Sequence, residues 1–149
     1  MPMKPIPYFG NYSLFTIHYN LRWQGSEERN EQMTDSIMFT KSKAFALRVV
    51  RLYKYLRDRK ESVIAKQMLR SGTSIGANIA ESRYAQSKSD FTAKLQIALK
   101  EAAETQYWLE LLRDAELVEP DKAFLSLCDD CTELIKLLTS SVKTSKENA

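Results

Sequence analysis

Residues 91–112, FTAKLQIALKEAAETQYWLELL, carry the clearest structural signal in the chain. Mostly apolar residues recur there in alternating steps of four and three, at Phe91, Leu95, Ala98, Ala102, Thr105, Leu109 and Leu112. This heptad spacing places all of them along one side of an α-helix. Leu99, Trp108 and Leu111 widen that side, so we expect this helix to be contacted from more than one direction.

Three further segments have helical spacing. The first is expected from about Thr40 to Arg59, the second begins near Ser62 as its N-cap, and the last has Pro120 in its first turn. Between the second and third segments, Ser87 or Ser89 is the expected N-cap. The apolar positions of the three segments are, in order, Phe45, Val49, Leu52 and Leu56; Ile64, Met68, Gly72, Ile75 and Ile79; and Phe124, Leu127, Cys128, Cys131, Leu134, Ile135, Leu138 and Val142.

The chain has 149 residues, the length of one domain, with only four glycines and four prolines. Such low turn content argues against an all-β fold. The sequence therefore predicts an all-α, up-down-up-down four-helix bundle over residues 36–143. Residues 144–149 are polar and are expected to fray.

Residues 1–35 differ from the rest of the chain. They hold three of the four prolines and aromatic residues without helical spacing. Two interpretations stay open: a flexible, poorly structured N-terminal arm, or a mis-annotated start with translation beginning at Met33. No secretion signal or membrane-spanning run is recognisable, and we expect a protein of the reducing cytoplasm, without a membrane association.

The positive charge is concentrated in one segment. The formal net charge is +3, yet residues 41–70 contain ten basic and two acidic residues, a local net charge of +8. This excess favours a polyanionic partner. The alternative is a basic helix that docks on acidic helices of its own chain. The candidate nucleic-acid-binding residues are Arg48, Arg51, Lys54, Arg57, Arg59, Lys60 and Lys66.

A second group of residues has a structural interpretation. Gly72 and Gly76 lie four residues apart within a run of small residues that ends at Asn78. Either the helix breaks here, or the small residues allow a neighbouring helix to approach closely, and the spacing favours close approach. Glu101 and Glu104, near Trp108, are expected to pair with Arg70 or Arg83 across a helix interface.

The sequence offers no recognisable catalytic or metal-binding constellation. His18 is the only histidine, so the Glu-x-x-His pairs of di-iron bundles are absent. Cys128 and Cys131 lack the two further ligands of a zinc site and are expected to be small core residues. Ser71, Thr73 and Ser74 have no accompanying base. We therefore expect no enzyme activity, no cofactor and no metal.

Two motifs resemble a known family. The stretches LRSGTSIGANIAE (residues 69–81) and ALKEAAETQYWLELL (98–112) closely resemble the four-helix-bundle protein family. Its members include proteins encoded in intervening sequences of bacterial 23S ribosomal RNA genes, and it is similar to the accessory variability protein of diversity-generating retroelements. The resemblance spans roughly residues 37–142.

This resemblance implies a left-handed bundle that assembles as a homopentamer. It also implies nucleic-acid binding and association with a reverse transcriptase, as for the retroelement proteins. With the basic segment, it predicts a non-enzymatic oligomeric scaffold or accessory protein that binds RNA or DNA with little sequence preference. The alternative is a protein–protein adaptor ring that docks an acidic partner protein without nucleic acid.

Overall fold

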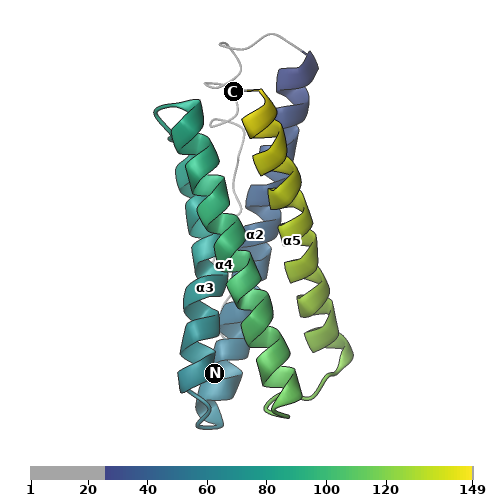
Figure 1. The fold of residues 1–149 in the computed structure, drawn as a ribbon. Coiled ribbons are helices and arrows are strands. Elements are labelled where there is room, and N and C mark those ends of the chain that lie inside the picture. Colours follow the sequence, from purple (N-terminus) through teal and green to yellow (C-terminus); the bar gives the residue numbers. More distant parts are fainter. Residues whose placement is uncertain (1–25, 149) are drawn as a thin grey trace, which may run out of the picture. The chain divides into compact units, whose positions relative to one another are not determined.

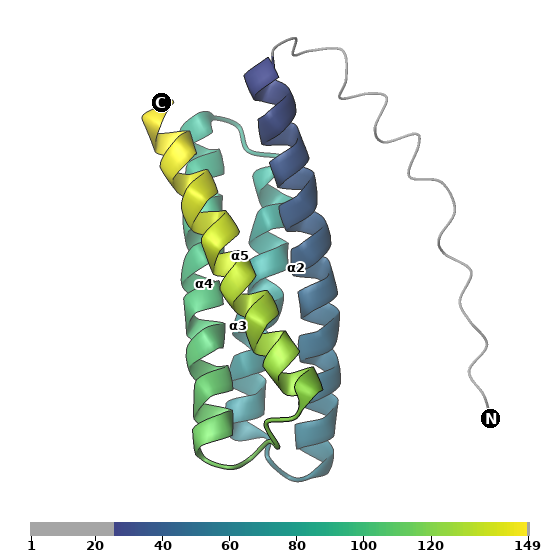
Figure 2. The ribbon, with the colours of Figure 1, turned by 90° about the vertical axis from the view of Figure 1, so that its right-hand side faces the viewer.

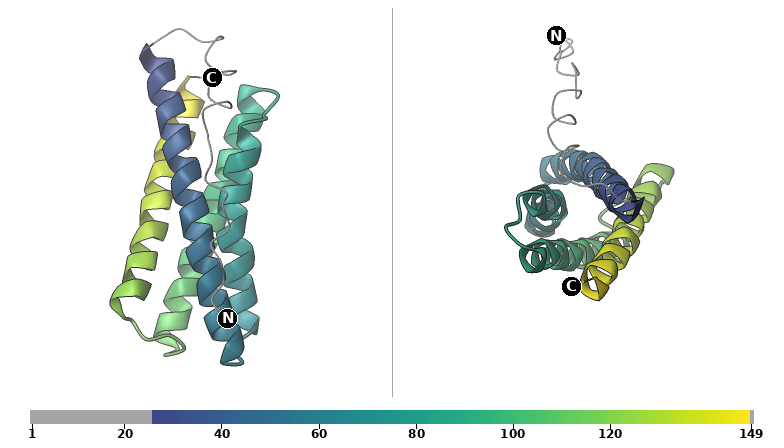
Figure 3. Two further views of the ribbon diagram at one scale, coloured as in Figure 1. Left: turned by 180° about the vertical axis from the view of Figure 1, so that it is seen from behind. Right: turned by 90° about the horizontal axis from the view of Figure 1, so that it is seen from above.

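The computed structural model describes the backbone of residues 26–148 and the side chains of residues 33–148. The described residues form four helices: α2 (Ser26–Asp58), α3 (Val63–Ser82), α4 (Lys88–Asp114) and α5 (Lys122–Glu147). Residues Asp35–Ala149 form one compact unit, which begins within one residue of the predicted boundary. In this unit consecutive helices run antiparallel, and α2, α3, α4 and α5 follow one another around the bundle (Figures 1, 2 and 3). The predicted up-down-up-down four-helix bundle is confirmed.

The core is built from the predicted heptad positions of α4 and from apolar stripes of the other helices. Leu95, Ala98, Ala102, Leu109 and Leu112 are almost completely buried, together with the hydroxyl-bearing Thr105. Phe91 at the start of the seam is only half-buried. The facing buried side chains include Phe45, Val49 and Leu56 of α2, Met68, Ile75 and Ile79 of α3, and Leu127, Leu134 and Leu138 of α5.

The glycines of α3 lie inside a continuous helix and mark its contact with α2. A Cβ atom added to Gly72 would lie 2.8 Å from Cγ1 of Val49, which is itself fully buried. A Cβ atom added to Gly76 would lie 3.5 Å from Oγ of Ser42, an ordinary van der Waals distance. Close approach of the two helices, rather than a helix break, is therefore the role of this segment.

Several helix ends differ from the predicted ones. The predicted arm reaches residue 35, whereas α2 is already helical at Ser26; the part of the arm before that lies outside the described residues. Helix α5 continues to Glu147, beyond the predicted fray point at 144, because Ser145 is buried and its hydroxyl meets that of Thr92. Pro120 precedes the α5 N-cap, Asp121, and so lies outside the helix.

The N-caps of α3 and α4 behave differently. The Ser87 side chain accepts a 3.1 Å hydrogen bond from the backbone N–H of Asp90, as an N-cap should. Ser62 occupies the N-cap position of α3 but makes no capping hydrogen bond through its side chain. The turn after α2 and the turn after α4 each place a non-glycine residue at positive φ, Lys60 and Glu116 respectively.

In the part of the chain that the structure describes, no helix is long and apolar enough to cross a membrane.

The glycine contact predicts opposite effects for two matched substitutions. Gly72→Ala should lower the free energy of unfolding by about 1–2 kcal/mol, since overpacking against Val49 outweighs the better helix propensity of alanine. Gly76→Ala should raise it by about 0.5–1 kcal/mol, because the methyl group fits and the propensity gain remains. Urea unfolding followed by circular dichroism measures both values. Equal stability of the two variants would contradict the close contact at Gly72.

Candidate nucleic-acid interface

The basic residues of α2 point in different directions, because they step by three along the helix. Arg48 faces α5, where its guanidinium pairs with Asp130 and donates to the carbonyl of Ala123 at 2.8 Å and to Oγ of Ser126 at 3.3 Å. Its side chain is 30% exposed. Arg48, a member of the predicted phosphate-binding set, therefore has a structural contact that ties α2 to α5.

A second ion pair joins the same two helices. Nζ of Lys41 lies 2.9 Å from Oε1 of Glu133, again between α2 and α5. This is the arrangement of the alternative interpretation, in which a basic helix docks on acidic residues of its own chain. It accounts for Lys41 and Arg48, but other cations of the basic segment have no acidic partner among the described residues.

The remaining cations are exposed along one side of α2 and beyond its end. Lys43, Arg51 and Lys54, with Leu47 between them, follow steps of four, four and three, and all four side chains are exposed. Lys60 lies in the α2–α3 turn and Lys66 in the first turns of α3. None of these cations forms an ion pair with any residue that the structure describes. We call them the basic surface: Lys43, Arg51, Lys54, Lys60 and Lys66.

Arg57 and Arg59 have local contacts but stay exposed. Nη2 of Arg57 lies 3.0 Å from Oδ1 of its neighbour Asp58, and both side chains are more than half exposed. The guanidinium of Arg59 stacks 4.5 Å from the ring centroid of Tyr55. Exposed ion pairs between neighbours contribute little energy, so Arg57 can exchange Asp58 for a phosphate at small cost.

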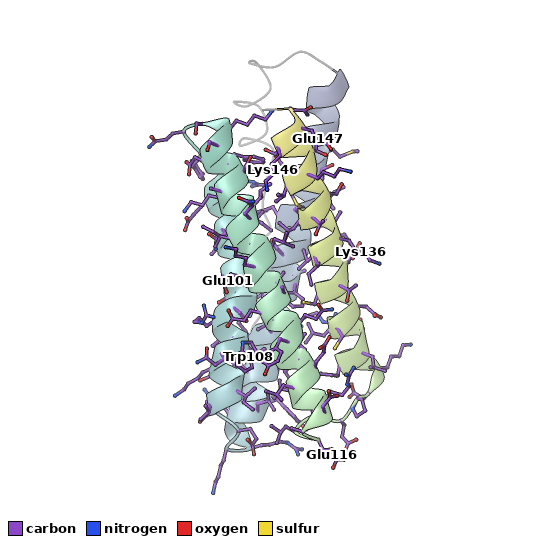
Figure 4. All side chains as sticks on the ribbon, in the orientation of Figure 1. Glu101, Trp108, Glu116, Lys136, Lys146 and Glu147 are labelled. Atoms are coloured by element: carbon purple, nitrogen blue, oxygen red, sulfur yellow. The ribbon has the colours of Figure 1, made fainter. Side chains whose placement is uncertain are left out.

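Arg70 has a different role from the cations of the basic surface. Its guanidinium pairs with Glu104 and approaches Oε2 of Glu101 at 3.5 Å, which joins α3 to α4. Nε1 of Trp108 donates a 3.0 Å hydrogen bond to the same Glu104. Figure 4 shows Glu101 and Trp108 along the α3 side of α4. The hydrogen bond from Arg70, followed by that from Trp108, holds the pKa of Glu104 below its usual value.

This network predicts a pH-dependent contribution to stability. Glu104→Gln should lower the free energy of unfolding by about 0.5–1 kcal/mol at neutral pH, the range of partly exposed ion pairs. Because the folded-state pKa of Glu104 is depressed, the contribution is present above the unfolded-state pKa of about 4.3 and is lost as the pH falls through the folded-state value. Chemical denaturation across this pH range measures the difference between variant and wild type.

Glu110→Gln is the matched control, since Glu110 is an exposed α4 carboxylate without a hydrogen bond or ion pair to any described residue. Its effect should be small at every pH. A Glu104→Gln difference that persists unchanged in acid would contradict the assigned pairing.

The small polar residues of α3 bond to their own helix. The hydroxyl of Thr73 donates to the carbonyl of Leu69 at 2.8 Å, and the side-chain amide of Asn78 donates to the carbonyl of Ser74 at 2.9 Å. Ser71 is fully buried, and its Oγ lies 2.8 Å from Oγ1 of Thr105 on α4. The Thr73 and Asn78 bonds are therefore satisfied within α3, whereas the Ser71–Thr105 contact joins α3 to α4.

The two cysteines belong to the interior of the bundle. Cys131 is fully buried, and burial raises the pKa of its thiol to about 12. Cys128 is half-buried, and burial raises the pKa of its thiol as well. Both are free thiols held in their protonated form at neutral pH. No group of three or more His, Cys, Asp or Glu side chains suited to a metal ion occurs in the described residues.

A groove of about 370 Å³ lies beside the basic surface and was not predicted from the sequence. It lies between α2, the connection from α4 to α5, and the start of α5. Arg51 and Tyr55 are on its α2 side. The sequence contained a partial signal for Tyr55, because this aromatic residue falls outside the apolar stripe of its helix and is 42% exposed. Lys43 was missed too, although its spacing from Arg51 places it on the same side of α2.

The aromatic pair on α4 is separate from this groove. The rings of Tyr107 and Trp108 meet edge to face with centroids 5.0 Å apart. Trp108 packs against the core, whereas Tyr107 is 56% exposed. Trp108 therefore has the structural role that its place in the widened seam predicts.

Residues 34–140 match the family model described as 23S rRNA-intervening sequence protein. Among solved structures, the chain is similar to a protein of unknown function from the S23 ribosomal protein family of Bacteroides thetaiotaomicron. The two are 53% identical in sequence and superpose with a TM-score of 0.70, and the match covers 74% of this chain and 98% of that one. No match was found among curated proteins.

Proposed function

The chain belongs to the family of 23S rRNA-intervening sequence proteins, and on this basis we propose that it is a non-enzymatic oligomeric scaffold whose basic surface binds RNA or DNA with little sequence preference. The observation that carries the proposal is the set of exposed cations on and beyond α2. Lys43, Arg51 and Lys54 lie on one side of a rigid helix, free of intrachain carboxylates among the described residues.

The spacing of these cations supports phosphate binding. A helix rises about 1.5 Å per residue, so Lys43 and Lys54 are about 16 Å apart, a distance that spans several phosphates of one strand. Arg51 and Lys54 are about one turn apart and can contact neighbouring phosphates. Such contacts are independent of sequence, and they release counterions, so binding weakens steeply with salt.

Action by binding rather than by catalysis is part of the proposal. The hydroxyls of Ser71 and Thr73 bond to carbonyls of their own helix. The thiols of Cys131 and Cys128 are buried and half-buried respectively, and burial raises the pKa of both, which supports structural roles for the residues that resemble nucleophiles. The free cysteines also support action in the reducing cytoplasm.

Self-association is the second part of the proposal. The outer side of α4 exposes Ile97 and Tyr107, 42% and 56% accessible, together with Ala93 and Ala103. Helix α4 lies diagonally across the bundle from α2, so an interface there leaves the basic surface open (Figure 3). Repetition of the basic surface in a ring gives avidity from weak individual contacts. The pentamer, and a reverse transcriptase as partner, rest on the family resemblance alone.

The binding proposal predicts a loss of affinity that depends on position, not only on net charge. The double variant Arg51→Glu, Lys54→Glu should bind nucleic acid at least about ten-fold more weakly at about 50 mM salt, with a salt slope reduced by about 1.5–2 for the two lost contacts. Fluorescence anisotropy titrations at several salt concentrations measure both quantities. Circular dichroism should show unchanged helicity.

Lys136→Glu, Lys146→Glu is the matched control, because it changes the net charge equally on α5 (Figure 4). It should leave the salt slope nearly unchanged. Equal weakening by both double variants would place the binding site elsewhere. If neither protein retards RNA or DNA at low salt while an acidic protein binds, the adaptor function replaces this proposal.

The oligomer predicts a particle of about 86 kDa, five times the chain mass of 17.2 kDa, in light scattering at micromolar concentration. Ile97→Lys should shift it towards the single-chain mass, because the charge would have to be buried in the interface. Leu125→Lys, at a 46% exposed apolar residue of α5, is the control and should leave the mass unchanged. A wild-type species of 17 kDa would refute the oligomer.

A further inference from the structure

The groove beside α2 combines an apolar floor with an open mouth. Val118, Phe124 and Leu127 line it and are at least nine-tenths buried, and Leu52 is half-buried beside them. Its volume of about 370 Å³ falls within the roughly 300–1,000 Å³ typical of small-molecule sites. The groove can therefore hold one flat ring system.

The α2 rim of the groove is cationic and aromatic. Arg51 is exposed and forms no ion pair with any residue described by the structure, whereas Arg48, which forms part of the wall, is already held by α5. Tyr55 lies one turn after Arg51 and stacks with the Arg59 guanidinium, and 42% of its surface stays accessible. This rim provides a phosphate contact beside an exposed aromatic ring.

The opposite rim is acidic. Glu119 and Asp121 line it, and both are exposed. Asp121 already accepts a 2.8 Å hydrogen bond from the backbone N–H of Phe124, whereas the carboxylate of Glu119 has no hydrogen-bond or ion-pair partner in the described part of the chain. A ligand that is anionic throughout is repelled by this rim, but a ligand with N–H donors is attracted to it.

An unpaired nucleobase on a phosphate chain matches the cationic rim, the apolar floor and the acidic rim of the groove. Its phosphate is anionic, its ring is flat and largely apolar on its faces, and cytosine, adenine and guanine carry amino groups. Charge complementarity thus places the phosphate at Arg51 and the amino group at Glu119, which leaves the ring between them, beside the exposed face of Tyr55. A paired base cannot enter, because its edge is bonded to its partner and its faces are stacked.

We propose that the groove binds one unpaired base of a single strand whose phosphates lie on Arg51 and Lys54, and that Glu119 favours bases with an amino group over uracil or thymine. This inference rests on the proposed nucleic-acid binding and adds to it a preference for single strands. Tyr55 contributes stacking, and Glu119 accepts a hydrogen bond from the amino group.

The test compares labelled strands of about 12 nucleotides, within the range of known single-strand sites, at about 50 mM salt. Oligo-C and oligo-U form the matched pair, because cytosine has an amino donor where uracil has a carbonyl acceptor. A mixed-sequence strand is compared with its own duplex. Anisotropy should show the single strand bound about five-fold more tightly than the duplex, and oligo-C about five-fold more tightly than oligo-U.

Two variants assign these preferences to residues. Tyr55→Ala should weaken single-strand binding about ten-fold and leave duplex binding unchanged, whereas Tyr55→Phe and Tyr84→Ala, at an exposed tyrosine in the turn after α3, should bind as wild type does. Glu119→Gln, at an exposed position where folding is not at risk, should remove the difference between oligo-C and oligo-U. Thermal unfolding confirms that each variant is folded.

Equal affinity for single strand and duplex, with Tyr55→Ala acting equally on both, overturns this inference while nucleic-acid binding itself stands. An oligo-C preference that persists in Glu119→Gln overturns the role of Glu119. Absence of binding to every strand overturns the proposed function, and this inference with it.

Discussion

The close approach of α2 to α3 at Gly72 is the contact on which the rest of the arrangement depends. Val49 of α2 occupies the space that a larger side chain at position 72 would need, so this contact sets which side of α2 faces α3. Arg48 and Lys41 then fix the neighbouring side of α2 to α5. The remaining side of α2 packs against none of the other described helices, and its Lys43, Arg51 and Lys54 side chains are exposed.

The basic segment therefore has two functions that the sequence alone does not separate. Arg48 and Lys41 stabilise the bundle, and Arg70 joins α3 to α4 through Glu101 and Glu104. The cations of the basic surface have no such partners among the described residues, and this surplus is what supports binding to a polyanion. The groove beside Tyr55 adds an apolar and an acidic component, which gives the surface chemistry beyond charge.

The sequence predicted what depends on periodicity. Leu95 and Leu109 follow a heptad and are buried, and the spacing of Gly72 and Gly76 marked a helix contact. The direction of Arg48 was not predictable in this way, because steps of three place successive side chains on different sides of a helix. Periodicity does not show that Asp130 of α5 lies close enough to pair with it. The groove was missed because its floor includes Val118, which lies in a connection without a repeating pattern.

Binding of RNA by the basic surface can be located by acetylating the lysine amines of the protein with and without saturating single-stranded RNA, and by measuring the modification of each lysine by mass spectrometry. RNA should protect Lys43, Lys54 and Lys60, which are exposed, whereas Lys136 on the outer side of α5 should react equally in both states. Unchanged reactivity of Lys54 in the complex, or protection centred on Lys136, would contradict binding by the basic surface.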